Sequence, residues 1–325
     1  MTTIRSTTLQ PRTHAGRPLT KQRQGILYLL PFIAIFGLFG LFPLVYSGVV
    51  SLNKVDLQTP NQMTFVGFGN YVKLFSDPFF WNALGNTITL GILACGPQLV
   101  IALFIANLLN YRSKYRTFWR VAILLPYATS IAAATLIFAQ IYGHQYGPIN
   151  SILTHLGLPG VDWQNGTFAS QLAIASIVTW RWTGYNALIY LAAMQSISDD
   201  LYEAADLDGA SKWRQLRSIT IPSIRGTILF TVVVSTIGAM QLFAEPLLFE
   251  GGPTGVQGGV SHQYQTLTLY MYQQGFSYFH LGYASAIAFT ILLLVLVALG
   301  VGFAGQRGAI GLNRLFTRGG KGPSE

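Results

Sequence analysis

Six long apolar windows limit what this chain can fold into. They cover about residues 26–50, 84–110, 120–142, 168–194, 226–250 and 284–304. A helix of about 20 apolar residues crosses the hydrocarbon core of a bilayer, and the windows lack the period-two alternation of a transmembrane strand. Only 10% of the residues are charged, whereas soluble domains carry about 25%. We therefore predict an all-α integral membrane protein with six transmembrane helices.

Basic residues gather on alternate connections between the windows. Residues 1–25, the second and fourth connections and residues 305–325 each carry several Lys or Arg, whereas the intervening loops hold only Lys54 and Lys73. The positive-inside rule places the basic segments in the cytoplasm, so both termini are predicted to be cytoplasmic. Because this bias accounts for the net charge of +9, no nucleic-acid partner is expected.

The windows also predict the domain organisation. A basic cytoplasmic segment covers residues 1–25, a six-helix domain with a cytoplasmic loop at 195–225 covers 26–304, and a cytoplasmic tail covers 305–325. The first window is longer than the roughly 7–15-residue core of a cleavable signal, so it is expected to stay in the protein. Cys95 is the single cysteine and the histidines lack ligand spacing, so no metal site is expected. No connection is long enough for a soluble catalytic domain, and the chain is not predicted to be an enzyme.

The cytoplasmic loop between the fourth and fifth windows has a helical pattern of its own. Asp200, followed three residues later by Glu203, matches a capping box for a short helix through Asp208. Gly209 can adopt the left-handed conformation at the end of that helix, and Ser211 can cap a second helix. We predict a helix-turn-helix hairpin whose first helix is acidic and whose second helix is basic.

The second helix of this hairpin has an apolar edge. Trp213, Leu216 and Ile219 recur at helical spacing, and Pro222 helps to end the helix. A cytoplasmic protein could bind this edge. An amphipathic surface hairpin without a partner is the alternative interpretation.

The hairpin resembles a known motif. Its residues read Glu203-Ala204-Ala205, then Gly209 after three residues, then Ile219-x-Ile221-Pro222 after nine. This pattern is similar to the EAA loop in the membrane subunits of bacterial ABC importers, which usually ends in Ile-x-Leu-Pro, so that Ile221 is the one departure. Further matches indicate the carbohydrate-importer branch, in particular the F-like permease subunits of the maltose and glycerol-phosphate type. These matches are Phe68-Gly69-Asn70-Tyr71, Asn86-Thr87, Leu125-Pro126 and Gly251-Gly252-Pro253.

The resemblance implies a type I ABC importer permease fold in which the EAA hairpin is the coupling helix that docks on a separate ATPase. The residues that it assigns to this coupling are Glu203, Ala204, Ala205, Asp206, Gly209, Ala210, Trp213, Ile219 and Pro222. The chain has no Walker A motif, so it is expected to bind no cofactor itself, and ATP and Mg²⁺ are expected on the partner ATPase. The implied partners are a second permease subunit, two ATP-binding subunits and an extracytoplasmic solute-binding protein.

Polar and aromatic residues in the fourth window are candidates for contacts with the substrate. By comparison with the maltose-type subunit, Trp180, Trp182 and Tyr185 correspond to sugar-contacting positions, as do Tyr127 and Gln241. Trp182 replaces a small residue of that relative, and Ile131 replaces a hydroxyl residue, which suggests a different sugar or pose. An interfacial aromatic belt or packing between helices is the alternative interpretation.

Two charged residues fall within the apolar windows. Arg181 lies in the fourth window, and Glu245, one turn beyond Gln241, lies in the fifth. A charge inside a membrane span usually faces the protein interior or a cavity, so Arg181 and Glu245 are a candidate intramembrane pair, with Glu245 also a candidate substrate contact. Alternatively, Arg181 extends to the outer membrane interface.

The expected function is that of a multi-pass permease in the cytoplasmic membrane of a bacterium. It would import a sugar, expected to be a di- or oligosaccharide, by alternating access in an ATP-driven, binding-protein-dependent system. The alternative is a secondary transporter driven by an ion gradient. That mechanism calls for buried acidic or His relay residues, of which the windows offer Glu245 and Glu250. A scaffold without transport would leave the polar residues of the fourth window unexplained.

Overall fold

The computed structural model describes residues 19–110 and 115–318, with side chains described over 28–110, 115–300 and at 302. The chain divides into two units, Met1–Val49 and Val50–Glu325. Most of the predicted segment 1–25 and the end of the predicted tail, residues 319–325, lie outside the described residues.

The first unit contains the first predicted span. Helix α1 (Leu19–Phe36) passes through the five-residue π-helix η1 (Gly37–Leu41) into α2 (Phe42–Ser51). The stretch Tyr28–Ser51 is long and apolar enough to cross a membrane, and it agrees with the window at 26–50. The π-helix is a widening of the backbone within an otherwise continuous helix.

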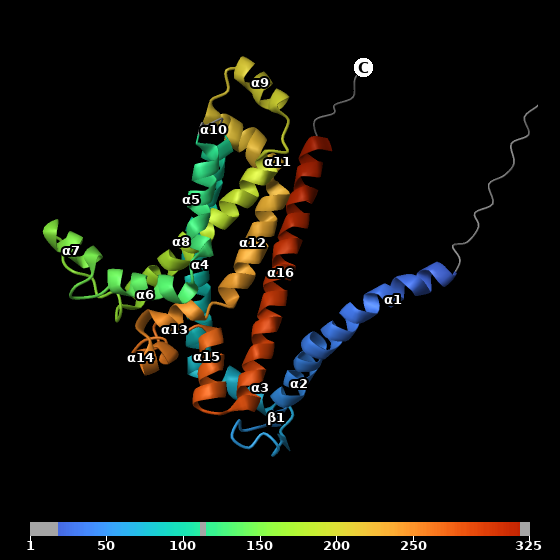
Figure 1. The fold of residues 1–325 in the computed structure, drawn as a ribbon, viewed down its shortest axis with the longest axis vertical. Coiled ribbons are helices and arrows are strands. Elements are labelled where there is room, and N and C mark those ends of the chain that lie inside the picture. The colour runs from blue at the N-terminus through green and yellow to red at the C-terminus, as the bar shows by residue number, and fades with distance from the viewer. Residues whose placement is uncertain (1–18, 111–114, 319–325) are drawn as a thin grey trace, which may run out of the picture. The chain divides into compact units, whose positions relative to one another are not determined.

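The second unit is helical apart from two short strands (Figure 1). Strands β1 (Asn53–Lys54) and β2 (Thr64–Phe65) pair antiparallel, with Asn53 opposite Phe65. The helices are α3 (Gly69–Phe75), α4 (Pro78–Asn110), α5 (Arg116–Ala128), α6 (Ile131–Ile141), α7 (Pro148–His155), α8 (Thr167–Met194), α9 (Asp199–Leu207), α10 (Lys212–Gln215), η2 (Leu216–Thr220), α11 (Ile221–Ser223), α12 (Arg225–Met240), α13 (Ala244–Glu250), α14 (Gly252–Gln257), α15 (Leu267–Tyr272), η3 (Gln273–Ser277) and α16 (Leu281–Arg318).

The centre of this unit is the pair α4 and α8, which pack along each other. Ala94, Ala102 and Ala106 of α4 and Ala187 of α8 are all buried. Small residues let two helix backbones approach closely, which is how helices associate in a membrane where the hydrophobic effect between them is weak. Helices α5 and α12 pack on this pair, and Figure 1 shows α9 and α10 at the opposite end of the unit from α14 and α15.

Two of the predicted spans are each broken into two helices. The window at 120–142 forms α5 and α6, which meet at 89°, because the backbone is extended at Thr129 and Ser130. The window at 226–250 forms α12 and α13, separated at 241–243. The last predicted span ends at 304, whereas α16 continues through Arg318.

Fewer than six of the described helices are long and apolar enough to count as membrane spans. Among the described residues, three helices are long and apolar enough to cross a membrane. The number rises to as many as five if two bent pairs, Arg116–Ala128 with Ile131–Ile141 and Lys212–Ser223 with Arg225–Met240, each count as one span. Helix α8 does not pass this test, although its 28 residues are about 42 Å long at about 1.5 Å per residue. Its polar residues lower its mean hydropathy, and several of them are buried in the unit. Six spans therefore stay a prediction.

Candidate functional site

The hairpin predicted within residues 195–225 comprises α9, α10 and η2. Helix α9 begins at Asp199, and the side chain of Ser198 accepts a hydrogen bond from the backbone N–H of Asp200. The predicted capping box at Asp200 and Glu203 is therefore wrong, because Ser198 is the N-cap and Asp200 lies in the first turn. The turn itself agrees with the prediction, since Gly209 has a φ of 71°, a conformation that side chains with a Cβ rarely adopt.

The second helix of the hairpin is fixed to the first through Asp206. The side chain of Ser211 caps it by accepting from the N–H of Arg214, as predicted. Lys212 Nζ lies 2.8 Å from Asp206 Oδ1, and Gln215 Nε2 donates to the same oxygen. The hydrogen bonds from Lys212 and then Gln215 lower the pKa of Asp206. Asp206 thus stabilises the hairpin from within, and its carboxylate is already occupied by these two groups.

The outer surface of the hairpin carries both charge and apolar side chains. Glu203 and Ala204 are exposed, as are Gly209 and Pro222, whereas Ala205, Ala210 and Ile219 are half-buried. Leu207 is 91% exposed and Trp213 60% exposed, although one face of the Trp213 ring stacks on Phe104 of α4 with 6.0 Å between the centroids.

Leu207 and Leu201 were not among the predicted coupling residues, and both are exposed. A large apolar residue in an otherwise acidic helix is the signal that could have identified them. An exposed apolar patch with a charged rim is typical of a surface that binds another protein.

At the level of the broken spans, α4, α8, α12 and α13 enclose a cavity of about 370 Å³. Its lining includes Arg181, Trp182, Gln241 and Glu245 of the predicted residues, together with Ile131. These side chains come from three segments far apart in the sequence. The structure therefore brings four of the predicted residues to one cavity.

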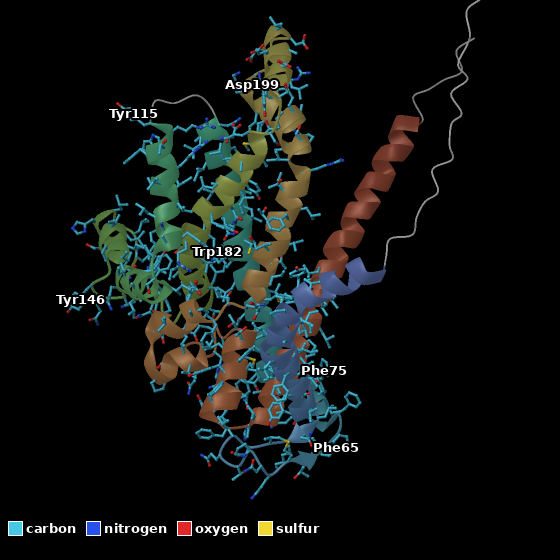
Figure 2. The ribbon with its side chains drawn as sticks, turned by 45° about the vertical axis from the view of Figure 1, so that its right-hand side comes forward. Phe65, Phe75, Tyr115, Tyr146, Trp182 and Asp199 are labelled. Carbon is cyan, nitrogen blue, oxygen red and sulfur yellow. The ribbon has the colours of Figure 1, made fainter. Side chains whose placement is uncertain are left out.

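Three aromatic rings form a cluster beside this cavity, which we call the aromatic cluster. Tyr127 and Tyr185 are stacked with their centroids 4.9 Å apart. The Trp182 ring lies 5.2 Å from that of Tyr127 and 5.7 Å from that of Tyr185, edge-on to both. Figure 2 shows Trp182 among the helices of the second unit, well away from Asp199 at the start of the hairpin.

Trp180 is not part of the aromatic cluster. Its ring lies 5.2 Å from that of Phe138 of α6, and 40% of the residue is exposed. Positions 180 and 182 are about 200° apart around a helix at about 100° per residue, so the two tryptophans face different neighbours. The prediction that groups Trp180 with Trp182 and Tyr185 in one substrate site does not agree with this geometry.

Arg181 and Glu245 form a buried ion pair. Arg181 Nη1 lies 3.2 Å from Glu245 Oε1, and each residue is 5% exposed. The structure therefore contains the predicted Arg181–Glu245 pair. The alternative, in which Arg181 extends to the outer membrane interface, is wrong. Arg181 Nε has no partner among the described residues. Two buried charges require each other, because removal of one partner leaves the other desolvated and unpaired.

Sequence reasoning missed polar residues on the far wall of the cavity. Gln98 of α4 lines it, is 2% exposed and donates through Nε2 to Ser235 Oγ at 3.1 Å. A glutamine within an apolar window, next to Pro97, is the signal that could have identified it. Cys95 also lines the cavity, and its Sγ lies 3.4 Å from the Ser235 carbonyl oxygen.

The break between α12 and α13 places Gln241 in the cavity. Gln241 is the C-cap of α12 and is exposed to the cavity space. Two threonines at the start of α15 donate hydrogen bonds to backbone carbonyl groups that the break leaves without helical partners. Thr266 Oγ1 donates to Leu242 O at 2.6 Å, and Thr268 Oγ1 donates to Met240 O at 3.3 Å. A broken helix is tolerated inside a membrane protein where side chains satisfy such groups.

Comparison with known proteins adds to this geometry. A family model described as binding-protein-dependent transport system inner membrane component matches residues 98–305. The chain is 36% identical over 257 residues to the lactose transport system permease protein LacF of Rhizobium radiobacter, covering 78% of this chain and 84% of the relative. It is 33% identical over 277 residues to the sulfoquinovosyl glycerol transport system permease protein SmoG of Agrobacterium fabrum, covering 85% and 88%.

A solved structure is also similar. It is a bacterial alginate ABC transporter in complex with a periplasmic protein that carries an alginate pentasaccharide. The matched chain has a TM-score of 0.74 and 25% sequence identity, over 87% of this chain and 94% of that chain.

Proposed function

Because the chain belongs to the family of binding-protein-dependent transport system inner membrane components, we propose that it is the permease subunit of an ABC importer for a di- or oligosaccharide. The observation that carries the proposal is the course of α8. This helix supplies Arg181, Trp182 and Tyr185 to the cavity region and runs directly into the hairpin at Ser198. One helix thus connects a candidate substrate site to a candidate docking surface for an ATPase.

The cavity region suits a sugar. Aromatic faces pack on the C–H faces of pyranose rings through dispersion and apolar burial, and Tyr127, Trp182 and Tyr185 present such rings. Gln241 offers an amide that can both donate to and accept from hydroxyl groups. Glu245 can accept a hydrogen bond from a hydroxyl only at the carboxylate lone pairs that its bond to Arg181 does not use. The named relatives that transport lactose and sulfoquinovosyl glycerol support a saccharide as the substrate class.

The hairpin suits a cytoplasmic ATPase. Glu203 would meet basic or polar groups of a cleft on that partner, while Leu207 and Trp213 would bury their exposed apolar surface there. ATP and Mg²⁺ would be held by two ATP-binding subunits, and this chain would bind no cofactor. A second permease subunit and an extracytoplasmic solute-binding protein would complete a transporter in which this chain crosses the cytoplasmic membrane six times.

In this proposal, transport is by alternating access. The solute-binding protein delivers the sugar to the outer loops, ATP-driven closure of the partner subunits moves the hairpin, and the helices joined to it change the side from which the cavity is open. The backbone leaves the helical conformation at 129–130 and 241–243, and short irregular segments between helices are positions that can absorb a hinge movement.

A secondary transporter is the competing function. Such a protein needs a protonatable group that is free to change its charge within the membrane. Glu245 is already bonded to Arg181 within a buried ion pair, so its carboxylate is not free for that role. The geometry therefore favours an importer that takes its energy from a partner.

Uptake measurements test the proposal. Cells that lack the chain and cells complemented with it are compared for uptake of radiolabelled lactose, maltose, trehalose and arabino-oligosaccharides. We expect complementation to restore uptake of at least one of them, and we expect that uptake to survive collapse of the proton gradient as long as ATP is present. Uptake that disappears with the gradient at constant ATP would establish the secondary transporter instead.

A further inference from the structure

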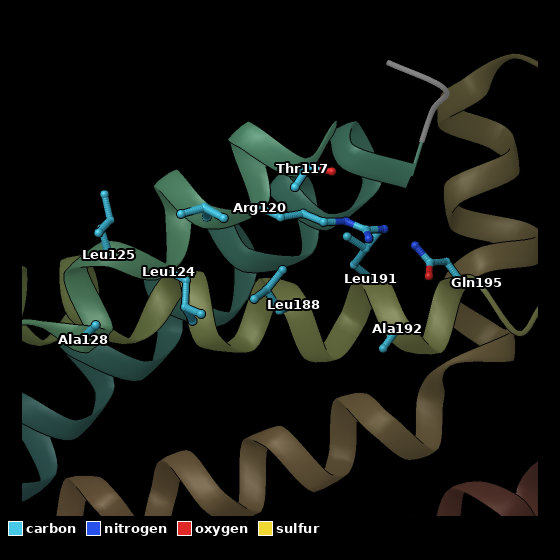
Figure 3. A pocket seen from close by; sticks show the side chains of 10 residues that line it. Thr117, Arg120, Leu124, Leu125, Ala128, Leu188, Leu191, Ala192 and Gln195 are labelled. Carbon is cyan, nitrogen blue, oxygen red and sulfur yellow. The ribbon is translucent and has the colours of Figure 1, made fainter. Parts of the chain in front are cut away.

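A second hollow, which we call the inner groove, runs along α5 and α8 towards the hairpin (Figure 3). It has a volume of about 530 Å³. Its walls are mostly apolar, and its end nearest the hairpin is formed by Arg120 and Gln195 (Figure 3). The main apolar lining residues are Val121, Leu124, Leu125, Leu188, Leu191 and Ala192.

The inner groove continues the face that carries the aromatic cluster. Leu124 is three residues before Tyr127 on α5, and Leu188 is three residues after Tyr185 on α8. Side chains three or four residues apart lie on the same face of a helix. The two antiparallel helices therefore present one continuous surface that leads from the aromatic cluster, through the groove, to the start of the cytoplasmic hairpin.

Polar groups close the cytoplasmic end of this surface. A rotation of the Gln195 amide by 180° from the orientation in Figure 3 lets its oxygen accept hydrogen bonds from Arg116 Nη2 and Arg120 Nη2. The two guanidinium groups lie four residues apart on α5, where like charges repel each other. A shared acceptor offsets this repulsion, and hydrogen bonds that involve a charged donor are stronger than neutral ones.

Each of the two guanidinium groups keeps a spare donor. The Nε atoms of Arg116 and Arg120 are buried and have no partner among the described residues. A sugar hydroxyl could accept from these N–H groups once a displacement of the two side chains exposed them, because Gln195 bonds only the Nη2 atoms. Burial of an unpaired N–H group is unfavourable, so the groups are suited to the brief binding of a polar molecule.

Gln195 also has a special place in the chain. It is the C-cap of α8, and Ser198, three residues later, caps the first helix of the hairpin. A movement of the hairpin therefore acts on Gln195 through three residues of backbone. A displacement of this side chain would release both guanidinium groups.

We propose that the inner groove is the cytoplasmic half of the sugar path and that Arg116, Arg120 and Gln195 form its gate, which the hairpin opens. This inference rests on the proposed importer function. Gln195 is a positioning residue, because it acts by fixing the two arginines across the end of the groove.

The test measures access to the groove from the cytoplasm and does not require the sugar to be known. Inverted membrane vesicles are prepared from cells that express the complete transporter, with Cys95→Ala as the background and Ala128→Cys as the probe. Ala128 lines the groove at the end away from Gln195 (Figure 3). A charged, membrane-impermeant methanethiosulfonate reagent is added to the cytoplasmic face, and the rate of modification is measured.

Two substitutions of Gln195 by residues of similar size distinguish an effect on the gate from a general effect on packing. Gln195→Leu cannot accept a hydrogen bond, and we expect it to raise the rate of modification about tenfold, equivalent to about 1.4 kcal/mol. Gln195→Glu keeps the acceptor and adds a charge that strengthens both bonds, so its rate is expected to equal or fall below that of the parent. Equal rates in the parent, Gln195→Leu and Gln195→Glu would overturn the proposal.

Arg120→Gln provides a second route to the same result if Gln195→Leu does not assemble. It removes one guanidinium group from the gate, and the rate should again rise. Ala106→Cys, at a position that is 0% exposed, reports on folding and should stay unmodified in every variant. An unchanged rate at Ala128→Cys together with normal sugar uptake would refute the gate alone, whereas an absence of all uptake with the unsubstituted protein would refute the importer.

Discussion

The hairpin and the cavity are stabilised in different ways. In the hairpin, Asp206, Lys212 and Gln215 bond to one another within nine residues, and both members of the Asp206–Lys212 ion pair are more than half exposed. In the cavity, Arg181 and Glu245 are 64 residues apart and almost fully buried. Exposed ion pairs contribute little to stability, whereas a buried pair is costly to break. Substitutions of exposed hairpin residues should therefore mainly change function, whereas substitutions of the buried ion pair at the cavity should change stability as well.

The largest effect on stability is expected from Glu245→Ala. This change leaves Arg181 buried and unpaired, which is expected to cost about 3–5 kcal/mol of unfolding free energy. The measurement is the thermal unfolding midpoint of the purified protein in detergent.

The matched control removes both charges together, as Arg181→Met with Glu245→Leu. Replacement of a whole buried pair by apolar residues is often neutral or stabilising, so the double variant should be more stable than Glu245→Ala. If the two variants unfold at the same temperature, the pair is not what stabilises this region.

A smaller loss of stability is expected from Gly184→Ala. A Cβ at position 184 of α8 would lie 1.6 Å from the carbonyl oxygen of Ile123 on α5, so the two helices would have to move apart at a cost of about 1–3 kcal/mol or more. Gly85→Ala is the control, because nothing lies within 4 Å of the added Cβ in α4. The same unfolding measurement should show a loss for Gly184→Ala and none for Gly85→Ala; similar losses in both would contradict the close approach of α5 and α8.

Gln241→Ala should leave the fold intact and weaken transport. Gln241 is at the cavity and its side chain makes no hydrogen bond within the described part of the chain, so its loss removes a contact to the substrate and little else. We expect the KM for uptake to rise about fivefold to tenfold, which corresponds to the loss of one hydrogen bond of about 1 kcal/mol, at an unchanged amount of assembled transporter. Unchanged uptake kinetics would remove Gln241 from the substrate site.

The smallest effect on stability and the largest on function are expected from Glu203→Lys. Glu203 is exposed on α9, so the variant should unfold at the same temperature as the parent. The reversed charge should prevent docking of the ATPase and abolish ATP-driven uptake. Asp199→Lys, on the same helix and also exposed, serves as a control for charge reversal. Normal uptake by Glu203→Lys would place the docking surface elsewhere.

The hairpin could be predicted closely because its contacts are local. Gly209 and Ser211 occupy the turn and the second cap that their residue types suggest. The error at the first cap has a simple reason. Ser198 and Asp200 can both cap a helix, and the choice between them depends on where the preceding helix, α8, ends.

The cavity could be predicted only in part because its walls come from distant segments. Arg181 and Glu245 could be paired from the rarity of charges in apolar windows. No such signal connects Gln98 with Ser235. Trp180 was grouped with Trp182 in one site, although residues two positions apart lie on different sides of a helix. This error could have been avoided from the sequence alone. The break at 241–243 is bonded by Thr266 and Thr268, which lie 24 and 28 residues from their partners Leu242 and Met240.

The most direct test of the account is to identify what accompanies the chain in its own membrane. The tagged protein is extracted in mild detergent, and the proteins recovered with it are identified by mass spectrometry, for the parent and for Glu203→Lys. The account predicts a second permease and an ATP-binding subunit with the parent, and loss of the ATP-binding subunit alone with Glu203→Lys. Purification of the parent chain without any ATP-binding subunit would contradict an importer driven through the hairpin.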